Sequence, residues 1–196
     1  RSAVENWAMM IPGLKVVAPA FPADVKGLLA AAIRDPDPVL FFEQKSLYPM
    51  KGEVPDGEYV DQLGKAKVLR QGKDVTIVAL ALMVHRALDA AAILEKEHGI
   101  SATVVDLRSL VPLDTQTILT EVAKTGRLVT IEENPRLCGW GAEIASIVAD
   151  ECFWDLDAPV QRITTPHIPL PAADLLEDNT VPSVERIVRE IRAKMG

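Results

Sequence analysis

The sequence predicts an α/β protein built around a mostly parallel sheet. Short runs of β-branched and aliphatic residues recur along the chain, most clearly at Val75–Leu82, Ala102–Leu107 and Leu128–Ile131. Each run is followed by residues with helical spacing, and this regular alternation is typical of parallel sheets. Hydrophobic residues make up 48% of the 196 residues, which is enough to bury such a sheet on both faces.

The first fifty residues contain one strand–helix–strand unit. The predicted elements are the end of a helix at Val4–Ile11, a strand at Leu14–Ala18, a helix at Val25–Ile33 and a strand at Val39–Phe42. Asp24 is a candidate cap for the second helix. This unit has too few elements to cover both faces of its sheet, so we expect residues 1–45 to be the last part of a larger domain.

Residues 46–63 read as a linker, and residues 64–196 as a second domain. The linker carries Pro49, Gly52, Pro55 and Gly57 among charged residues, has no sustained period, and is longer than most loops within a compact domain.

In the second domain the alternation is complete, with at most five strands expected. The predicted elements are strands at Val75–Leu82, Ala102–Leu107, Leu128–Ile131 and Pro159–Thr164, and helices at Val84–His98, Thr115–Lys124, Ala142–Ala149 and Val184–Lys194. Asp114 and Ser183 are the predicted caps of the second and fourth of these helices. Residues 132–135 (EENP) are expected to end the third strand.

The bulk properties exclude some classes of partner. A net charge of −7 and a pI near 5.0 argue against nucleic acid or an anionic membrane. No apolar run reaches the roughly 20 residues of a membrane span. The two cysteines, Cys138 and Cys152, form no disulfide framework, so a reducing compartment is expected.

Two short motifs lie after the Leu128–Ile131 strand. Gly139 and Gly141 resemble part of a dinucleotide-binding fingerprint, but the third glycine and the later acidic residue are missing. Close packing of a helix on a strand is the favoured interpretation. Glu132 and Glu133 could act as an acid/base pair, but adjacent residues on a strand point to opposite sides, which favours a polar strand end.

Other catalytic patterns are absent from the sequence. His85, His98 and His167 have no spacing, with each other or with the cysteines, that resembles a metal site. The sequence contains no Gly-x-Ser-x-Gly elbow and no phosphate-binding loop. The motifs therefore predict no self-sufficient active site in this chain.

Four segments together resemble a known family: Ile11–Tyr48, Val105–Asp114 (VDLRSLVPLD), Thr130–Ser146 (TIEENPRLCGWGAEIAS) and His167–Val188. The chain resembles, along nearly all its length, the beta subunit of the thiamine-diphosphate-dependent decarboxylating component of 2-oxo acid dehydrogenases. Pyruvate, branched-chain 2-oxo acid and acetoin dehydrogenases share this pattern.

The resemblance implies a transketolase C-terminal-like three-layer fold, preceded by part of a pyrimidine-binding-type α/β domain. It also implies that the intact parent decarboxylates a 2-oxo acid, with pyruvate as the expected substrate, and then reductively acylates a lipoyl group. The family's cofactor glutamate and its catalytic His-Ser-Gln stretch would lie upstream of Arg1. No catalytic and no cofactor-binding residue is therefore expected in this chain, which should be inactive alone.

The resemblance further implies a structural potassium ion at a helix end, with Ala32, Ile33, Asp35 and Asp37 as ligands. Oxygen ligands at the carboxyl end of a helix suit a hard cation. A helix C-cap flanked by Pro36 and Pro38 is the alternative.

The expected partners are an alpha subunit, a second beta subunit and a dihydrolipoyl acyltransferase, without nucleic acid or membrane. The expected location is the cytoplasm of a bacterium, or the mitochondrial matrix of a eukaryote. Phe153, Trp154 and Leu156 are candidates for a subunit interface, or for packing beneath the Pro159–Thr164 strand. The alternative functions are a stand-alone, non-catalytic binding module of the same fold, or another thiamine enzyme such as a transketolase.

Overall fold

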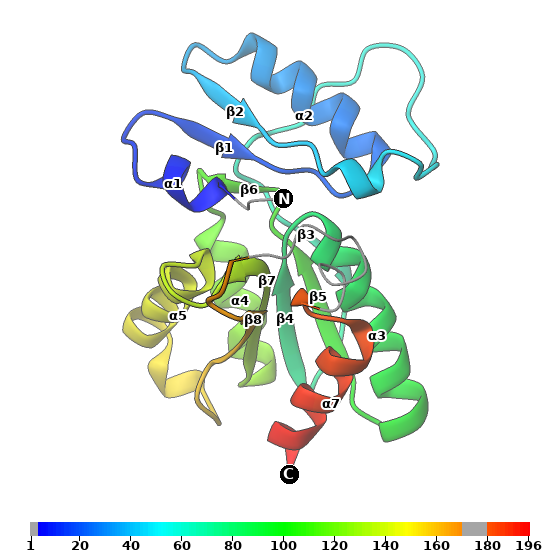
Figure 1. Cartoon of the computed structure of the whole chain (residues 1–196), viewed down its shortest axis with the longest axis vertical. Helices are drawn as coiled ribbons and strands as arrows, with labels where there is room; N and C mark the ends of the chain where they lie inside the picture. Colours follow the sequence, from blue (N-terminus) through cyan, green and yellow to red (C-terminus); the bar gives the residue numbers. More distant parts are fainter. Residues whose placement is uncertain (1–3, 170–179) are drawn as a thin grey trace.

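The computed structural model describes residues 4–169 and 180–196. Two lobes lie one above the other along the long axis of the molecule, with the carboxyl terminus at the far end of the lower lobe (Figure 1). The upper lobe contains a three-stranded sheet, and the lower lobe contains a five-stranded sheet.

The upper lobe has the predicted strand–helix–strand unit. Its elements are α1 (Glu5–Met9), β1 (Lys15–Val17), α2 (Pro22–Arg34), β2 (Val39–Phe41) and the 3-10 turn η1 (Lys45–Leu47). Strands β1 and β2 pair in parallel, with Val16 opposite Leu40. The prediction that Asp24 caps α2 is wrong, because the helix starts two residues earlier at Pro22, which suits the first helical position.

The lower lobe is a sheet with the strand order β3-β5-β4-β7-β8, parallel except for β3 at one edge. Its strands are β3 (Lys67–Arg70), β4 (Val75–Ala79), β5 (Ala102–Asp106), β7 (Leu128–Pro135) and β8 (Gln161–Thr165). Its helices are α3 (Leu82–His98), α4 (Thr115–Thr125), α5 (Trp140–Glu151), the 3-10 turn η2 (Phe153–Asp155) and α7 (Val184–Met195). The three strongest predicted strands therefore lie side by side at its centre.

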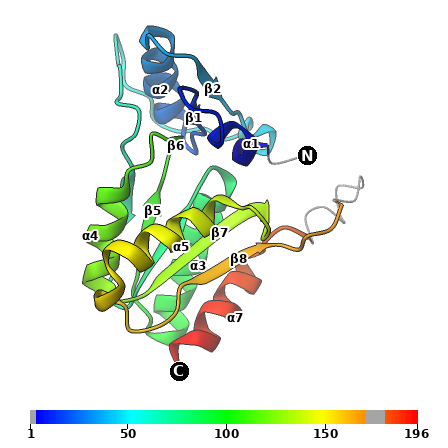
Figure 2. The same ribbon diagram turned by 90° about the vertical axis from the view of Figure 1, so that its left-hand side faces the viewer.

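Helices cover both faces of this sheet, which confirms the three-layer fold. Helices α4 and α5 lie on one face, and α3 and α7 on the other (Figure 2). Side chains from β4 alternate between the two cores: Ile77 packs toward α3 and α7, and Val78 toward α4 and α5. The predicted caps are confirmed, since Asp114 accepts from the Thr117 N–H at 3.2 Å and Ser183 from the Arg186 N–H at 3.1 Å.

Two strands were not predicted from the sequence, so the described residues after the linker contain six strands instead of at most five. β3 is only four residues long and begins with a lysine and ends with an arginine, as an edge strand can. β6 (Ser109–Val111) is short and directly precedes Pro112. It pairs antiparallel with β1 of the upper lobe, so a segment from the second half of the chain completes the upper sheet.

The third predicted strand also ends later than expected. β7 continues through residues 132–135 to Pro135, since this segment pairs with β8 after an irregularity in the register. Among the described residues, no helix combines the length and apolarity that crossing a membrane would require.

The connection between the lobes has no strand between β2 and β3, and its last part packs on α2. A Cβ atom on Gly27 would lie 2.6 Å from the Tyr59 ring and 2.9 Å from the Asp61 Cβ atom. The Asp61 N–H also donates to the Gly27 carbonyl at 3.0 Å. The boundaries at 1–45, 46–63 and 64–196 stay a prediction.

Candidate functional site

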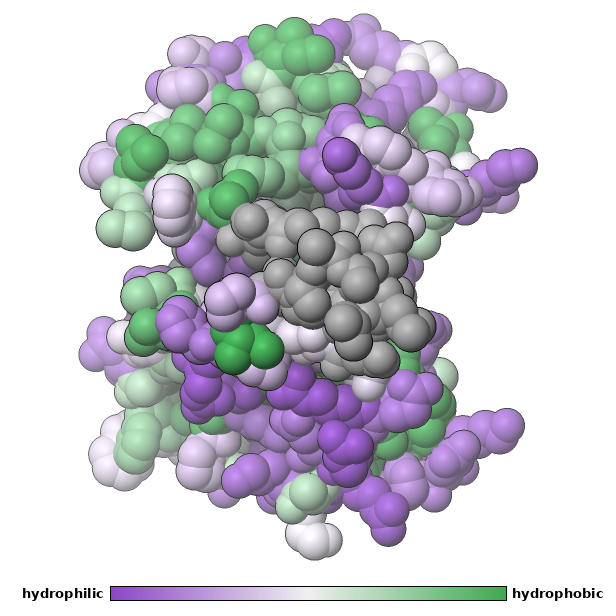
Figure 3. Space-filling model, viewed as in Figure 1, coloured by the Kyte–Doolittle hydropathy of each residue, from purple (hydrophilic) through white to green (hydrophobic). Residues whose placement is uncertain are grey.

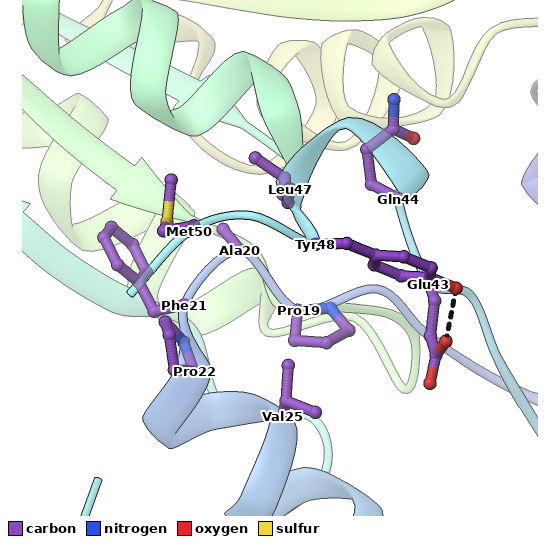
Figure 4. Close-up of a pocket in the computed structure, with 10 residues that line it drawn as sticks. All are labelled: Pro19, Ala20, Phe21, Pro22, Val25, Glu43, Gln44, Leu47, Tyr48 and Met50. Carbon is purple, nitrogen blue, oxygen red and sulfur yellow. Dashed lines mark hydrogen bonds between the residues drawn. The ribbon is translucent and has the colours of Figure 1, made fainter. Parts of the chain in front are cut away.

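A pocket of about 310 Å³ lies where the carboxyl ends of the two sheets approach each other. The loop after β1 (residues 18–21) and the segment after β2 (residues 42–50) form its walls (Figure 4). Ligands of open α/β sheets commonly bind beyond the carboxyl ends of parallel strands, and often between domains. This pocket is therefore the candidate ligand site of the described structure.

The lining of the pocket is mainly apolar. Its residues are Pro19, Ala20, Phe21, Pro22, Val25, Glu43, Gln44, Leu47, Tyr48 and Met50. Figure 4 shows Phe21 and Met50 at one end, and Tyr48 and Glu43 at the other. The Tyr48 hydroxyl donates to a carboxylate oxygen of Glu43 at 2.7 Å, and this hydrogen bond raises the pKa of Tyr48. The polar groups are therefore concentrated at one end of an apolar pocket.

The lower lobe holds both walls of the pocket in place. The His85 Nε2 atom, in the first turn of α3, lies 2.7 Å from the Ala20 carbonyl oxygen. The His85 ring also packs against Phe21, with ring centroids 4.7 Å apart. On the other wall, the Gln44 amide donates to Glu133 at 3.2 Å. These contacts fix the pocket at the junction of the lobes.

A buried cluster of charged side chains lies at the same junction and is centred on Arg108. Its guanidinium Nη1 atom lies 3.2 Å from the Asp24 carboxylate and 2.5 Å from the Asp61 carboxylate. Asp24 also accepts from Lys67 at 2.6 Å. Burial alone would lower the pKa of Arg108, but the hydrogen bond and charge of Asp61 outweigh it and raise that pKa.

Asp106 is the carboxylate of this cluster with the fewest hydrogen-bond partners. Its Oδ1 atom accepts from the Arg108 backbone N–H at 3.0 Å, and its Oδ2 atom has no hydrogen-bond partner within the described residues. Burial raises the pKa of Asp106 to about 7. No sequence motif predicts this cluster; an arginine within the apolar run VVDLRSLV is the one signal that points to it.

The two glutamates at the end of β7 point to different surroundings, as the strand geometry predicted. Glu133 contacts Gln44, whereas Glu132 is fully buried and accepts from the Arg162 guanidinium at 3.0 Å. Burial raises the pKa of Glu132, and the Gly141 backbone N–H and Arg162 partly oppose this. They therefore do not form an acid/base pair.

Glu132 also explains the Gly139–Gly141 motif. A Cβ atom on Gly141 would lie 2.5 Å from the Glu132 Oε2 atom and 2.5 Å from the Thr130 hydroxyl. The first turn of α5 thus approaches a carboxylate at the place where a dinucleotide fingerprint would hold phosphate. This supports the packing interpretation of the motif.

The predicted potassium ligands lie at the carboxyl end of α2. The Asp35 carboxylate binds the Lys15 ammonium at 2.7 and 2.8 Å, and Asp37 lies 3.4 Å from the same nitrogen. The Ala32 carbonyl accepts from the Asp35 N–H at 3.3 Å. The carbonyl oxygens at this helix end suit a monovalent cation. The Asp35 carboxylate is already bound by Lys15, so Asp35 would contribute its main-chain oxygen.

The remaining candidate residues lie apart. His98 lies in the last turn of α3, as expected, and His167 in an exposed loop. The described residues contain no group of three His, Cys, Asp or Glu side chains placed to hold a metal. Trp154 is 94% exposed and stacks edge-on against exposed Phe153, whereas Leu156 packs on the core beside α4 and α5.

Comparisons with known proteins agree with this architecture. Residues 64–187 match the transketolase C-terminal domain, and residues 2–51 match the transketolase pyrimidine-binding domain. A solved structure, a split-gene transketolase described as an inactive beta4 tetramer, superposes with a TM-score of 0.82 at 27% identity. That superposition covers 100% of this chain and 62% of the transketolase chain.

Curated relatives are more similar in sequence. The beta subunit of acetoin:2,6-dichlorophenolindophenol oxidoreductase from Bacillus subtilis is 54% identical over 91% of this chain and 52% of its own length. The mitochondrial pyruvate dehydrogenase E1 beta subunit of Pisum sativum is 53% identical over 94% and 52%. The 2-oxoisovalerate dehydrogenase beta subunit of Bacillus subtilis is 46% identical over 92% and 56%.

The chain spans about half the length of these relatives. The predicted resemblance to beta subunits of 2-oxo acid dehydrogenases is confirmed, and so is the transketolase-type fold. Both matched domain types are found in thiamine-diphosphate-dependent enzymes. The chain belongs to the transketolase C-terminal domain family, and its sequence places it with the beta subunits of pyruvate, acetoin and branched-chain 2-oxo acid dehydrogenases.

Proposed function

We propose that this chain is the C-terminal part of a beta subunit in the decarboxylating component of a 2-oxo acid dehydrogenase, with pyruvate as the preferred substrate. Acetoin and branched-chain 2-oxo acids are the alternative substrates. One observation carries the proposal. About half of the aligned residues are identical to those of beta subunits from pyruvate, acetoin and branched-chain enzymes, over more than nine-tenths of this chain.

Thiamine diphosphate supplies the carbanion chemistry of such a component when it is bound. In this chain the buried core, the Arg108 cluster and the Glu132 contact all hold elements together, and none presents a nucleophile or a base to open space. This supports a structural role for the described residues, with the catalytic contacts supplied by other parts of the assembly.

The proposed partners are an alpha subunit, a second beta subunit and a dihydrolipoyl acyltransferase. Trp154 and Phe153 support an interface, because a solvent-exposed pair of large aromatic side chains is typical of residues that a partner covers. The bacterial relatives favour the cytoplasm as the location, and the plant relatives, which are mitochondrial, favour the mitochondrial matrix in a eukaryote.

The helix end at residues 32–37 is the proposed potassium site. Carbonyl oxygens of Ala32 and Ile33, with main-chain oxygens of Asp35 and Asp37, would hold the ion. Anomalous scattering from crystals grown with thallium in place of potassium tests this: a peak at the end of α2 is expected. Only ordered water at this position would contradict the site.

The function is tested by combining the intact beta subunit with candidate alpha subunits and thiamine diphosphate. The oxidative decarboxylation of pyruvate and of branched-chain 2-oxo acids, and the oxidative cleavage of acetoin, are then followed with an artificial electron acceptor. We expect activity with one substrate class in the assembly, and none from residues 1–196 alone. Turnover by this chain alone, or no activity with any alpha subunit, would contradict the proposal.

A further inference from the structure

We propose that the pocket between the β1 and β2 loops binds a small amine with an aromatic or aliphatic body. The ammonium head would contact Glu43, and the body would extend toward Phe21 and Met50. This site goes beyond the proposed dehydrogenase function and does not depend on it, since all its residues lie within this chain.

The size and lining of the pocket favour a small ligand. About 310 Å³ lies at the lower end of the range for small-molecule sites. Figure 4 shows Pro19 and Val25 along one side, between the Phe21 and Tyr48 ends of the pocket. Apolar walls with a few polar groups at one end are the usual arrangement for binding and orienting a ligand.

The charge at the polar end selects the class of head group. Glu43 contributes a carboxylate, and one of its oxygens already accepts the Tyr48 hydroxyl. No lysine or arginine is among the lining residues. A cationic donor therefore gains a charge-assisted hydrogen bond at this end, whereas a carboxylate ligand would meet like charge.

The pocket is also held open by contacts outside it. The His85–Ala20 hydrogen bond and the Phe21–His85 ring contact fix one wall, and the Gln44–Glu133 hydrogen bond fixes the other. A preformed pocket binds a ligand without the entropic cost of ordering its walls.

Three probes that share one body test the proposal: 4-phenylbutylamine, 4-phenylbutyrate and 4-phenylbutanol, titrated into the full chain by calorimetry and by NMR. We expect the amine to bind about tenfold more tightly than the alcohol, with the carboxylate weakest. Amide shifts should be concentrated in residues 19–25 and 43–50.

Variants assign the binding to this pocket. Glu43→Gln should weaken amine binding about tenfold and leave alcohol binding unchanged. Tyr48→Phe removes the hydrogen bond that competes for Glu43, so amine binding should strengthen about threefold. Val25→Phe fills the pocket and should abolish binding of all three probes. Glu53→Gln, at an exposed acid that follows this segment and lies outside the lining, is the matched control and should change nothing.

Circular dichroism and thermal unfolding establish that each variant is folded. Because Tyr48→Phe should bind the amine more tightly, misfolding could not produce the result expected for it. No binding of the amine at millimolar concentration would overturn the proposal. Equal affinity for amine and carboxylate, or shifts that map to another surface, would overturn it as well.

Discussion

Arg108 and Asp24 form an ion pair across the junction of the two lobes, 84 residues apart in sequence. The Arg108 Nη1 atom lies 3.2 Å from the Asp24 Oδ1 atom, and the exposed fractions of the two side chains are 3% and 2%. Asp24 belongs to α2 of the upper lobe, and Arg108 joins β5 to β6. The lobes are thus linked by buried charge as well as by the pairing of β6 with β1.

Asp24→Asn should therefore destabilise the whole chain. The substitution keeps the shape of the side chain but removes the negative charge beside Arg108 and Lys67, so the free energy of unfolding should fall by roughly 3 kcal/mol. Urea denaturation followed by circular dichroism measures this loss.

Glu58→Gln is the matched control for Asp24→Asn, because it also breaks an ion pair made by α2, but one that lies at the surface. Glu58 is 76% exposed and pairs with Arg34 at 2.9 Å, so the expected change is below about 0.5 kcal/mol. Equal effects of the two substitutions would show that the buried pair does not link the lobes.

Much of the fold could be predicted from the sequence, because the central strands are continuous apolar runs and their helices carry clear caps. Asp114 and Ser183 illustrate this, since each is a short polar residue placed directly before a helical pattern. β6 could not be predicted: whether Ser109–Val111 pairs with β1 depends on the position of the upper lobe, which no local pattern encodes.

The candidate site was harder to predict for the same reason. The pocket is assembled from two loops that follow the paired strands β1 and β2, and His85 and Glu133 hold these loops from the lower lobe. Gly141 was recognised as a close-packing residue, but the atom that requires it, a carboxylate oxygen of Glu132, became evident only from the structure.

Asp106→Asn should change how stability depends on pH. Burial raises the pKa of Asp106 from 3.8 to about 7 in the folded chain, so the folded state holds a proton that the unfolded state releases. Asp106 therefore contributes a loss of stability as the pH rises from about 4 to about 7. Asparagine resembles the protonated acid and lacks this loss.

We expect the variant to be more stable than the parent at pH 8 by roughly 4 kcal/mol, and this difference to shrink as the pH falls toward 4. Urea denaturation at a series of pH values measures the difference. The charges of Asp24, Arg108 and Lys67 also shift the pKa of Asp106. Glu58→Gln, at an exposed acid outside this cluster, is measured in parallel as the control and should show no such dependence on pH. A difference between parent and Asp106→Asn that does not vary with pH would contradict the assignment.

The contact between Glu132 and the first turn of α5 can be tested with a double-mutant cycle. Gly141→Ala alone should cost roughly 3 kcal/mol, because the new methyl group would lie 2.5 Å from both the Glu132 carboxylate and the Thr130 hydroxyl. In a Glu132→Ala background the carboxylate is gone, so the same substitution should cost at least about 1 kcal/mol less. Strict additivity of the two substitutions would indicate that Glu132 is not what requires glycine at this position.

Ala81→Gly should stabilise the protein, because Ala81 has a backbone conformation that suits glycine. Its φ of 51° and ψ of −124° lie outside the regions that residues with a Cβ atom favour, at the turn from β4 into α3. Glycine removes this strain but increases the freedom of the unfolded chain, which leaves an expected net gain of about 1 kcal/mol. Ala87→Gly, inside α3, is the matched control and should destabilise by about 1 kcal/mol or more, since glycine disfavours a helix interior. Thermal and urea unfolding compare both variants with the parent, and a loss of stability in Ala81→Gly would show that the turn is not strained.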